Sequence, residues 1–168
     1  MSARGQFAQG TKFLLSDADE TAPEYIEIAE LTSIGGPEPT SDEIDYTSHS
    51  SPKGWRQFIQ GLKDGGSVSL EGNTVVDEDN LLDSGEGQVI LEEAFRDGDI
   101  REMVVAWPIK GEGDDYLVAE FEGFVQEPRQ NSAPVDDLID FSASIKISGE
   151  VPEPEIKDIT SLEPTQPE

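Results

Sequence analysis

The chain of 168 residues contains no cysteine and a single histidine, His49. Without cysteine it has neither a disulfide framework nor a thiolate metal site. No apolar run approaches the roughly 18 residues that a membrane-spanning helix needs, and the first residues have no apolar signal core. We therefore expect a protein that is made and used without secretion and that does not enter a membrane.

Positive charge is scarce as well. Lys and Arg total 11 residues against 37 Asp and Glu, which gives a formal net charge of -26. A surface with this excess of carboxylates repels phosphate groups, so it opposes binding to nucleic acid and to anionic membranes. The composition therefore argues against a nucleic-acid-binding protein.

Signals for catalysis are weak. A Ser/His/Asp site would have to use His49, which we interpret as an ordinary loop histidine. The sequence has neither a GxxxxGK[ST] motif nor a GxGxxG motif, so no phosphate-binding loop is predicted. Pairs of carboxylates could act as acid and base, as in glycosidases, but among 37 carboxylates such pairs arise by chance. We predict no enzyme and no cofactor.

Two further patterns have a binding interpretation. Residues 77–79 (DED) could bind calcium, but Leu81 and Leu82 stand where a calcium loop needs a ligand and a glycine. We interpret the segment as a solvated acidic loop and predict no metal site. Trp55 and Trp107 could form a sugar-binding platform, but packing in a core or in a subunit contact explains them more readily.

What the chain does contain is the alternation of apolar and polar residues that is typical of strands. Residues 25–30 alternate with a period of two, and residues 67–71 place Val68 and Leu70 on one face. Further expected features are strands at residues 100–107, 116–126 and 138–148, a hairpin turn at residues 111–114 and a bulge or close-packing point at Gly123.

One helix is predicted, with a cap at Asp83 or Ser84 and an end near Gly98. Its apolar face is expected to consist of Leu91, Ala94 and Phe95. One helix among about six strands predicts a mainly β fold, namely a β-sandwich or partly open barrel with one flanking α-helix.

The chain is expected to form one domain over residues 1–149, followed by a tail over residues 150–168. The tail holds four of the eleven prolines and six acidic residues against one lysine. Such a composition cannot build a packed core by itself. We therefore predict that the tail is dispensable for the fold and lies on the outside of an assembly or along a neighbour.

The connection over residues 47–66 is the most unusual part of the sequence. It is too long for a tight turn, and loops of this length are usually functional or disordered. Its large apolar residues argue against disorder, and their spacing of i, i+3, i+4 and i+7 is helical; they are Trp55, Phe58, Ile59 and Leu62. We expect them to be buried, either as a short helix on the subunit's own core or against a neighbouring subunit.

Short segments of this region and of later parts of the chain follow one another in a fixed order. They are IAELTSI (28–34), GP (36–37), IDYT (44–47), SP (51–52), GWRQFI (54–59), GLKDGG (61–66), VSLEGN (68–73), LEEAF (91–95) and FSASIKISG (141–149). Over roughly residues 10–150, their order and spacing resemble the major tail tube protein of long-tailed, non-contractile bacteriophages, the lambda-like tube family.

The resemblance implies a β-sandwich with one flanking helix, whose strands join a β-barrel shared between subunits. It implies hexameric rings that stack into a tail tube, the conduit for genome delivery. The implied partners are further copies of the chain, the tape-measure protein and the tail terminator and tip proteins, while phage DNA passes through the lumen without specific binding. The implied location is the virion tail, with assembly in the host cytoplasm and without a membrane.

On this interpretation, the connection over residues 47–66 is the main contact between subunits. The predicted interface residues are Trp55, Arg56, Phe58, Ile59, Leu62 and Lys63. The alternative from another class is an extracellular acidic β-sandwich module that binds a carbohydrate or a cation. That alternative would explain the acidity and the tryptophans, but not the long apolar connection.

Overall fold

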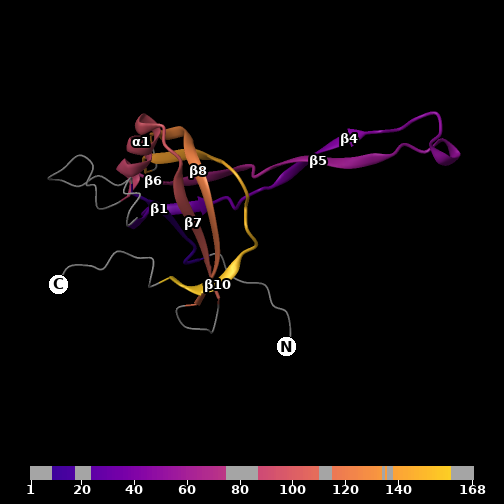
Figure 1. Cartoon of the computed structure of the whole chain (residues 1–168). Helices are drawn as coiled ribbons and strands as arrows, with labels where there is room; N and C mark the ends of the chain where they lie inside the picture. Colours follow the sequence, from indigo (N-terminus) through magenta and orange to yellow (C-terminus); the bar gives the residue numbers. More distant parts are fainter. Residues whose placement is uncertain are drawn as a thin grey trace.

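The structure, a computed structural model, describes residues 9–17, 24–74, 87–109, 115–133, 135 and 138–159, except the side chain of Pro52. Its body is an antiparallel sheet of eight strands with one α-helix, and a second sheet of two strands projects from it (Figure 1). The described part of the chain is therefore mainly β with one α-helix, which confirms the predicted fold class. No helix in these ranges is long and apolar enough to cross a membrane.

The strands of the body pair in the order β2, β1, β7, β8, β9, β6, β3, and β10 adds to β8. Their bounds are β1 Lys12–Ser16, β2 Tyr25–Glu27, β3 Leu31–Ile34, β6 Ser67–Asn73, β7 Arg101–Pro108, β8 Asp115–Ser132, β9 Asp140–Ile147 and β10 Glu155–Asp158. The strands expected in the body are confirmed, although β2 is shorter than predicted and β8 runs further, to Ser132.

Alternation along each strand decides which side chains enter the core. On β6, Val68 and Leu70 are fully buried, and they lie opposite Ile145 and Ala143 of β9. Gly123 of β8 is the predicted close-packing point, because a Cβ there would lie 2.7 Å from the carbonyl oxygen of Lys146. One face of the sheet therefore carries the main core.

The sheet curls because its two ends are joined by a short piece of chain. β2 and β3 lie at opposite ends of the strand order, yet only residues 28–30 separate them. Ile28 donates its N–H to the carbonyl of Phe13 on β1 (2.9 Å), and Glu30 accepts from the N–H of Asn73 on β6 (3.0 Å). The connection therefore bridges β1 and β6, and the body is a partly open barrel.

The helix α1 (Gln88–Asp97) packs Ile90, Leu91 and Ala94 onto the main core, whereas Phe95 is about half exposed. The side chain of Gln88 is buried and donates to the carbonyls of Ala29 (3.1 Å) and Asn73 (2.8 Å). These bonds satisfy backbone oxygens beside the bridge that joins β1 to β6.

The helix ends at Gly98, as predicted. Gly98 adopts a left-handed conformation, with φ of 68°, and donates its N–H to the carbonyl of Ala94 (3.1 Å). The helix begins at Gln88 with Gly87 as its N-cap, so the cap predicted at Asp83 or Ser84 is wrong. The turn predicted at residues 111–114 and the acidic loop at residues 77–79 lie outside the described residues.

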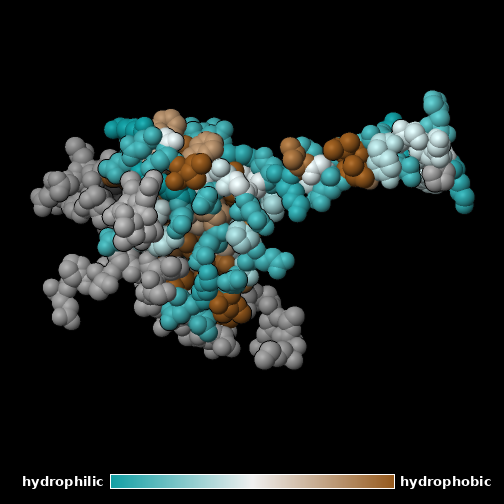
Figure 2. Space-filling view, in the orientation of Figure 1, coloured by the Kyte–Doolittle hydropathy of each residue, from teal (hydrophilic) through white to brown (hydrophobic). Residues whose placement is uncertain are grey.

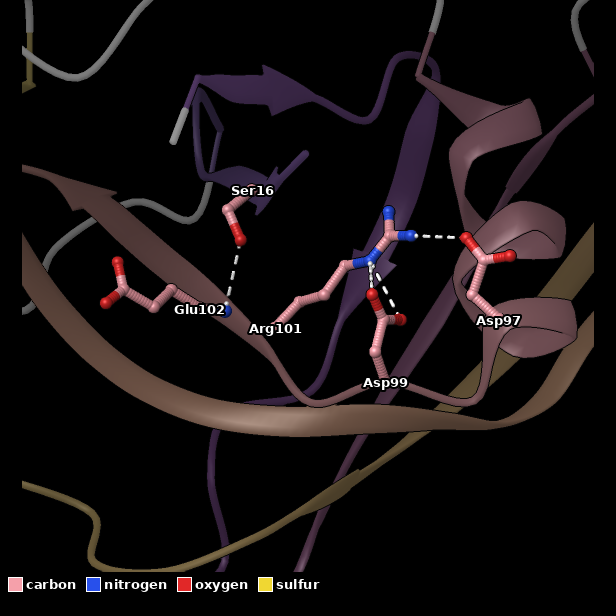
Figure 3. A network of polar contacts seen from close by, with 5 residues as sticks. All are labelled: Ser16, Asp97, Asp99, Arg101 and Glu102. Carbon is pink, nitrogen blue, oxygen red and sulfur yellow. Dashed lines mark hydrogen bonds and ion pairs between the residues drawn. The ribbon is translucent and has the colours of Figure 1, made fainter. Parts of the chain in front are cut away.

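A buried arginine ties the end of α1 to the start of β7 (Figure 3). The guanidinium of Arg101 contacts Asp97 at 3.0 Å and Asp99 at 3.1 Å, and its side chain is only 4% exposed. Beside it, Glu102 donates its N–H to the hydroxyl of Ser16 on β1 (3.1 Å). Two carboxylates balance the buried charge, so the guanidinium of Arg101 is neutralised within the body.

The C-terminal segment contributes a strand that its composition did not predict. Strand β10 pairs with the start of β8, where Ile156 lies opposite Leu117. Ile159 is buried with Leu14, Val104, Ala106 and Val118, in a second cluster on the other face of the sheet. The expectation that the tail lies outside the fold is therefore wrong for residues 155–159. A proline-rich segment that cannot form a core of its own can still add a strand to an existing sheet. The domain boundary after residue 149 stays a prediction.

Strands β4 (Thr40–Asp45) and β5 (Phe58–Asp64) form the projecting two-stranded sheet. We call residues 40–64 the arm, and it extends far from the body (Figure 1). The helix predicted from the spacing of Trp55, Phe58, Ile59 and Leu62 is wrong, since residues 58–64 are a strand. The same residues are exposed, so the alternative of a helix folded back on the core is wrong as well.

Candidate functional site: the projecting arm

The arm is a long hairpin held by regular pairing and by its loop. Ile44 lies opposite Ile59, and Asp45 lies opposite Phe58, with an irregularity nearer the body between Ser41 and Glu43. Pairing continues past β4, because Tyr46 donates its N–H to the carbonyl of Gln57 at 3.0 Å. The two strands of the arm therefore stay paired up to the loop that joins them.

Hydroxyl groups organise the loop at the tip of the arm. Thr47 accepts from the N–H of Gln57 at 2.9 Å, and Ser51 donates to the side-chain oxygen of Gln57 at 3.0 Å. The pKa of Asp45 is lowered from 3.8 by the hydrogen bond from the Thr47 side chain and then by that from its N–H. A short 3-10 turn over Pro52–Gly54 leads to Trp55.

Both faces of the arm expose large apolar side chains. Opposed residues of an antiparallel pair share a face, and successive residues alternate, so Ile44 and Ile59 lie on one face and Phe58 on the other. The irregularity adds one residue to β5, which places Leu62 on the face of Ile44 and Ile59. Leu62 is 82% exposed and Trp55 75%, and the remaining apolar side chains, Ile44, Tyr46, Phe58 and Ile59, are about half exposed. Figure 2 shows hydrophobic patches on the surface of the arm, between hydrophilic ones.

This exposure is unusual for a hairpin that stands apart from the body. A two-stranded hairpin is at best marginally stable in water, unless a face packs against something else. Exposed apolar patches of this kind mark interaction sites or aggregation liabilities. The arm has no third strand and no helix over either face among the described residues.

The root of the arm is fixed to the body by an ion pair and a glycine turn. Asp64 accepts from Lys146 on β9 at 2.6 Å and from the N–H of Gly66 at 2.7 Å. The Lys146 hydrogen bond, followed by that from Gly66, lowers the pKa of Asp64 from 3.8. Gly66 has φ of 79° and lies against the backbone of Glu38, so the turn from β5 to β6 requires glycine.

The structure places every predicted interface residue on the arm: Trp55, Arg56, Phe58, Ile59, Leu62 and Lys63. Sequence reasoning missed Ile44 and Tyr46, which lie on the opposite strand and its continuation. The available signal was the alternation of residues 44–46, an apolar pair around Asp45. That these residues contact another subunit stays a prediction.

The other candidate sites do not come together. Trp107 packs against the main core, where the backbone of Gly36 lies close to its ring, while Trp55 stands on the arm. His49 is exposed in a turn of the arm's loop. Within the described ranges, no group of three or more histidine or carboxylate side chains is placed to hold a metal ion.

Comparisons with known proteins give likeness in structure alone, since no protein-family model and no curated protein matches the sequence. A subunit of the SPP1 tail tube, determined by solid-state NMR and cryo-EM, is similar with a TM-score of 0.65. It is 18% identical, over 94% of this chain and 84% of that chain.

Two further similar subunits come from other tail-like particles. One is from the tail of an empty gene transfer agent particle refined with C6 symmetry, with a TM-score of 0.57 and 17% identity over 84% of this chain and 94% of that chain. The other is from the baseplate of the anti-feeding prophage, with a TM-score of 0.61 and 9% identity over 95% of this chain and 99% of that chain. The chain therefore has the fold of tail tube proteins, which confirms at the level of the fold the resemblance seen in the sequence.

Proposed function

We propose that the chain is a structural subunit of a phage-type tail, which polymerises as stacked hexameric rings into the tail tube, the conduit for genome delivery. The observation that carries this proposal is the arm. It projects from a body that has the fold of tail tube proteins, and it exposes apolar side chains on both of its faces. The tail of the similar gene transfer agent particle has C6 symmetry, which supports a ring of six. This role requires no catalysis.

The energetics of the arm fit a polymer better than a single tight pair. Complete burial of Trp55, Phe58, Ile59 and Leu62 would contribute roughly 6–12 kcal/mol per arm, an upper figure, at about 1.5–3 kcal/mol for each side chain. Association costs about 4–15 kcal/mol in lost freedom of motion. Because these terms are similar in size, one arm contact does not secure a subunit, and several neighbours must act together.

The two apolar faces suggest how those neighbours are arranged. Covering the face of Ile44, Ile59 and Leu62 leaves Phe58 exposed on the opposite face. Both faces are covered when the arm lies between two surfaces, which a stack of rings supplies and an isolated dimer does not. We therefore place Trp55, Arg56, Phe58, Ile59, Leu62 and Lys63 in contacts between subunits of the tube, together with Ile44 and Tyr46.

The barrel-like body and the charge agree with a conduit. Strands of neighbouring subunits that join one inner barrel would leave no exposed sheet edges. A net charge of -26 per subunit repels DNA phosphates, so the genome can pass without specific binding. The remaining proposed partners are the tape-measure protein and the terminator and tip proteins, and the proposed location is the virion tail after assembly in the host cytoplasm.

Size-exclusion chromatography and negative-stain electron microscopy of the purified chain test this function. The proposal predicts rings or tubes whose abundance rises with protein concentration. A stable monomer at all concentrations, with a melting temperature that rises on addition of calcium or a glycan, would instead identify the carbohydrate- or cation-binding module.

A further inference from the structure

Most of the arm, residues 46–63, differs from the rest of the chain in charge as well as in burial, while the arm's other residues include four carboxylates, Asp42, Glu43, Asp45 and Asp64. Residues 46–63 contain no Asp or Glu and three cations, Lys53, Arg56 and Lys63, so this stretch has a charge of +3. The other 150 residues hold 8 basic against 37 acidic residues, a net charge of -29. No other stretch of the sequence without an acidic residue is as long. The cations lie where the large apolar side chains are exposed.

The cations of the body are already used within the subunit. Each described one contacts a carboxylate at 2.6–3.7 Å; they are Lys12, Arg96, Arg101, Arg129, Lys146 and Lys157. The buried Arg101 of Figure 3 contacts two carboxylates. The lysines and arginines of the body are therefore poorly available for ion pairs with another protein.

The cations of the arm are left available. Lys53 and Lys63 are exposed and form no ion pair with any described residue. Arg56 has one contact, with Asp45 at 3.9 Å, and its side chain is 76% exposed. An exposed pair at this distance contributes little. Arginine and tryptophan side by side, as at Trp55 and Arg56, are the residue types that carry most binding energy at protein interfaces.

We propose that the arm binds the carboxylate-bearing surface of a second copy of this chain, with Lys53, Arg56 and Lys63 forming ion pairs across that contact. The inference rests on the proposed function and adds its electrostatic part. Copies with a charge of -26 repel one another, and the cationic stretch of the arm, residues 46–63, reduces that repulsion where it meets an acidic neighbour. The apolar side chains supply affinity, while the cations set the orientation and speed of docking.

A second copy of the chain is a better partner for the arm than nucleic acid, because the rest of the subunit is strongly acidic. A polyanion that approached the three cations would also meet the remaining net charge of -29 on the same subunit. The acidic surface of another copy can be oriented so that its carboxylates meet the arm while the rest of its charge points away. Charge complementarity therefore selects this chain as its own partner.

Two arginines provide a matched test. Arg56 on the arm and Arg96 on α1 are 76% and 77% exposed, and each has one long contact with a carboxylate, at 3.9 and 3.7 Å. Arg56→Glu and Arg96→Glu change the net charge by the same amount. We expect R56E to raise the protein concentration needed for assembly by about tenfold or more and R96E to change it little, as measured by sedimentation and electron microscopy. Equal effects of the two variants, or no effect of R56E, would overturn the inference.

Carbodiimide cross-linking gives a second readout. In assemblies mixed from 14N- and 15N-labelled chains, we expect Lys53 and Lys63 to be joined to Asp or Glu of the other isotope. Cross-links within one chain alone, or tight binding of a short DNA duplex that R56E abolishes, would contradict the assignment of the partner. If the wild-type chain does not assemble at all, the proposed function fails. If it assembles and R56E assembles equally well, the electrostatic inference alone fails.

Discussion

The body and the arm are both antiparallel β-structure, but they treat apolar side chains in opposite ways. Leu70 on β6 is fully buried, whereas Leu62 on β5 is 82% exposed, although only a turn at Gly65 and Gly66 separates the two strands. The body buries its core residues within one subunit, although it also exposes some apolar side chains, among them Ile100, Leu138 and Ile156. The arm can bury its apolar side chains only against something else, so they are expected to stabilise an assembly rather than the monomer.

The largest expected effect separates the two regions directly. Leu70→Ala leaves a cavity in the main core and should lower the free energy of unfolding by about 2–5 kcal/mol. Leu62→Ala should change that of the monomer by less than about 0.5 kcal/mol, as an exposed substitution. Urea unfolding, followed by circular dichroism at concentrations where the chain is monomeric, measures both. Similar losses in the two variants would show that the arm contributes to the monomer's core.

The C-terminal segment tests where the body ends. Truncation after Gly149 removes β10 and exposes the surface that Ile159 covers, so we expect a loss of about 1.5–3 kcal/mol from that side chain alone. Truncation after Ile159 keeps both and serves as the control, with an unchanged melting temperature. If the shorter variant melts like the full chain, β10 adds nothing to the fold and the boundary after residue 149 is supported.

Gly66 tests the junction between the two regions. A Cβ at this position would lie 2.9 Å from the carbonyl carbon of Glu38, and the residue has φ of 79°. Gly66→Ala should therefore cost about 1–3 kcal/mol in the monomer. Gly54→Ala is a control for positive φ without contact, since nothing lies within 4 Å of its Cβ position. Equal thermal stability of the two variants would show that the contact with Glu38 is relaxed at no cost.

The smallest expected effect concerns the ion pair at the arm's root. Because the pKa of Asp64 is lowered in the folded state, its contribution is present above the unfolded value near 3.8 and is lost as pH falls through the folded value. NMR titration of the Asp64 carboxyl carbon should give a midpoint below 3.8. Lys146→Met should raise that midpoint, because it removes the main cause of the shift. A wild-type midpoint at or above 3.8 would mean that the pair is not formed in solution.

Sequence reasoning succeeded where a strand of the body buries one face, as β6 and β9 do. Val68 and Leu70 alternate with Ser67 and Ser69, and such alternation has one physical cause. Tertiary contacts then fixed features that the pattern could not specify, such as the length of β8 and the bridge over residues 28–30.

The same reasoning failed in the arm because neither of its faces is buried. Phe58 lies on one face, and the irregularity in the pairing places Ile59 and Leu62, three residues apart, on the other, so no two-residue period remains and the spacing imitates a helix. The strand β10 was missed for a different reason. Residues Glu155–Asp158 show no pattern of buried residues, and they form a strand only by pairing with β8. The six predicted interface residues were nevertheless brought together on the arm, because large apolar residues in a long connection require a partner whatever their secondary structure.

The most direct test of the account is the double variant Trp55→Ala, Phe58→Ala. Its monomer should keep the far-ultraviolet circular dichroism spectrum and melting temperature of the wild type, because Trp55 is 75% exposed and Phe58 about half exposed, and neither packs on the core of the body. The same protein should form no tubes in electron microscopy at concentrations where the wild type does. A loss of several kcal/mol in monomer stability, or normal polymerisation, would contradict the claim that the arm exists to hold subunits together.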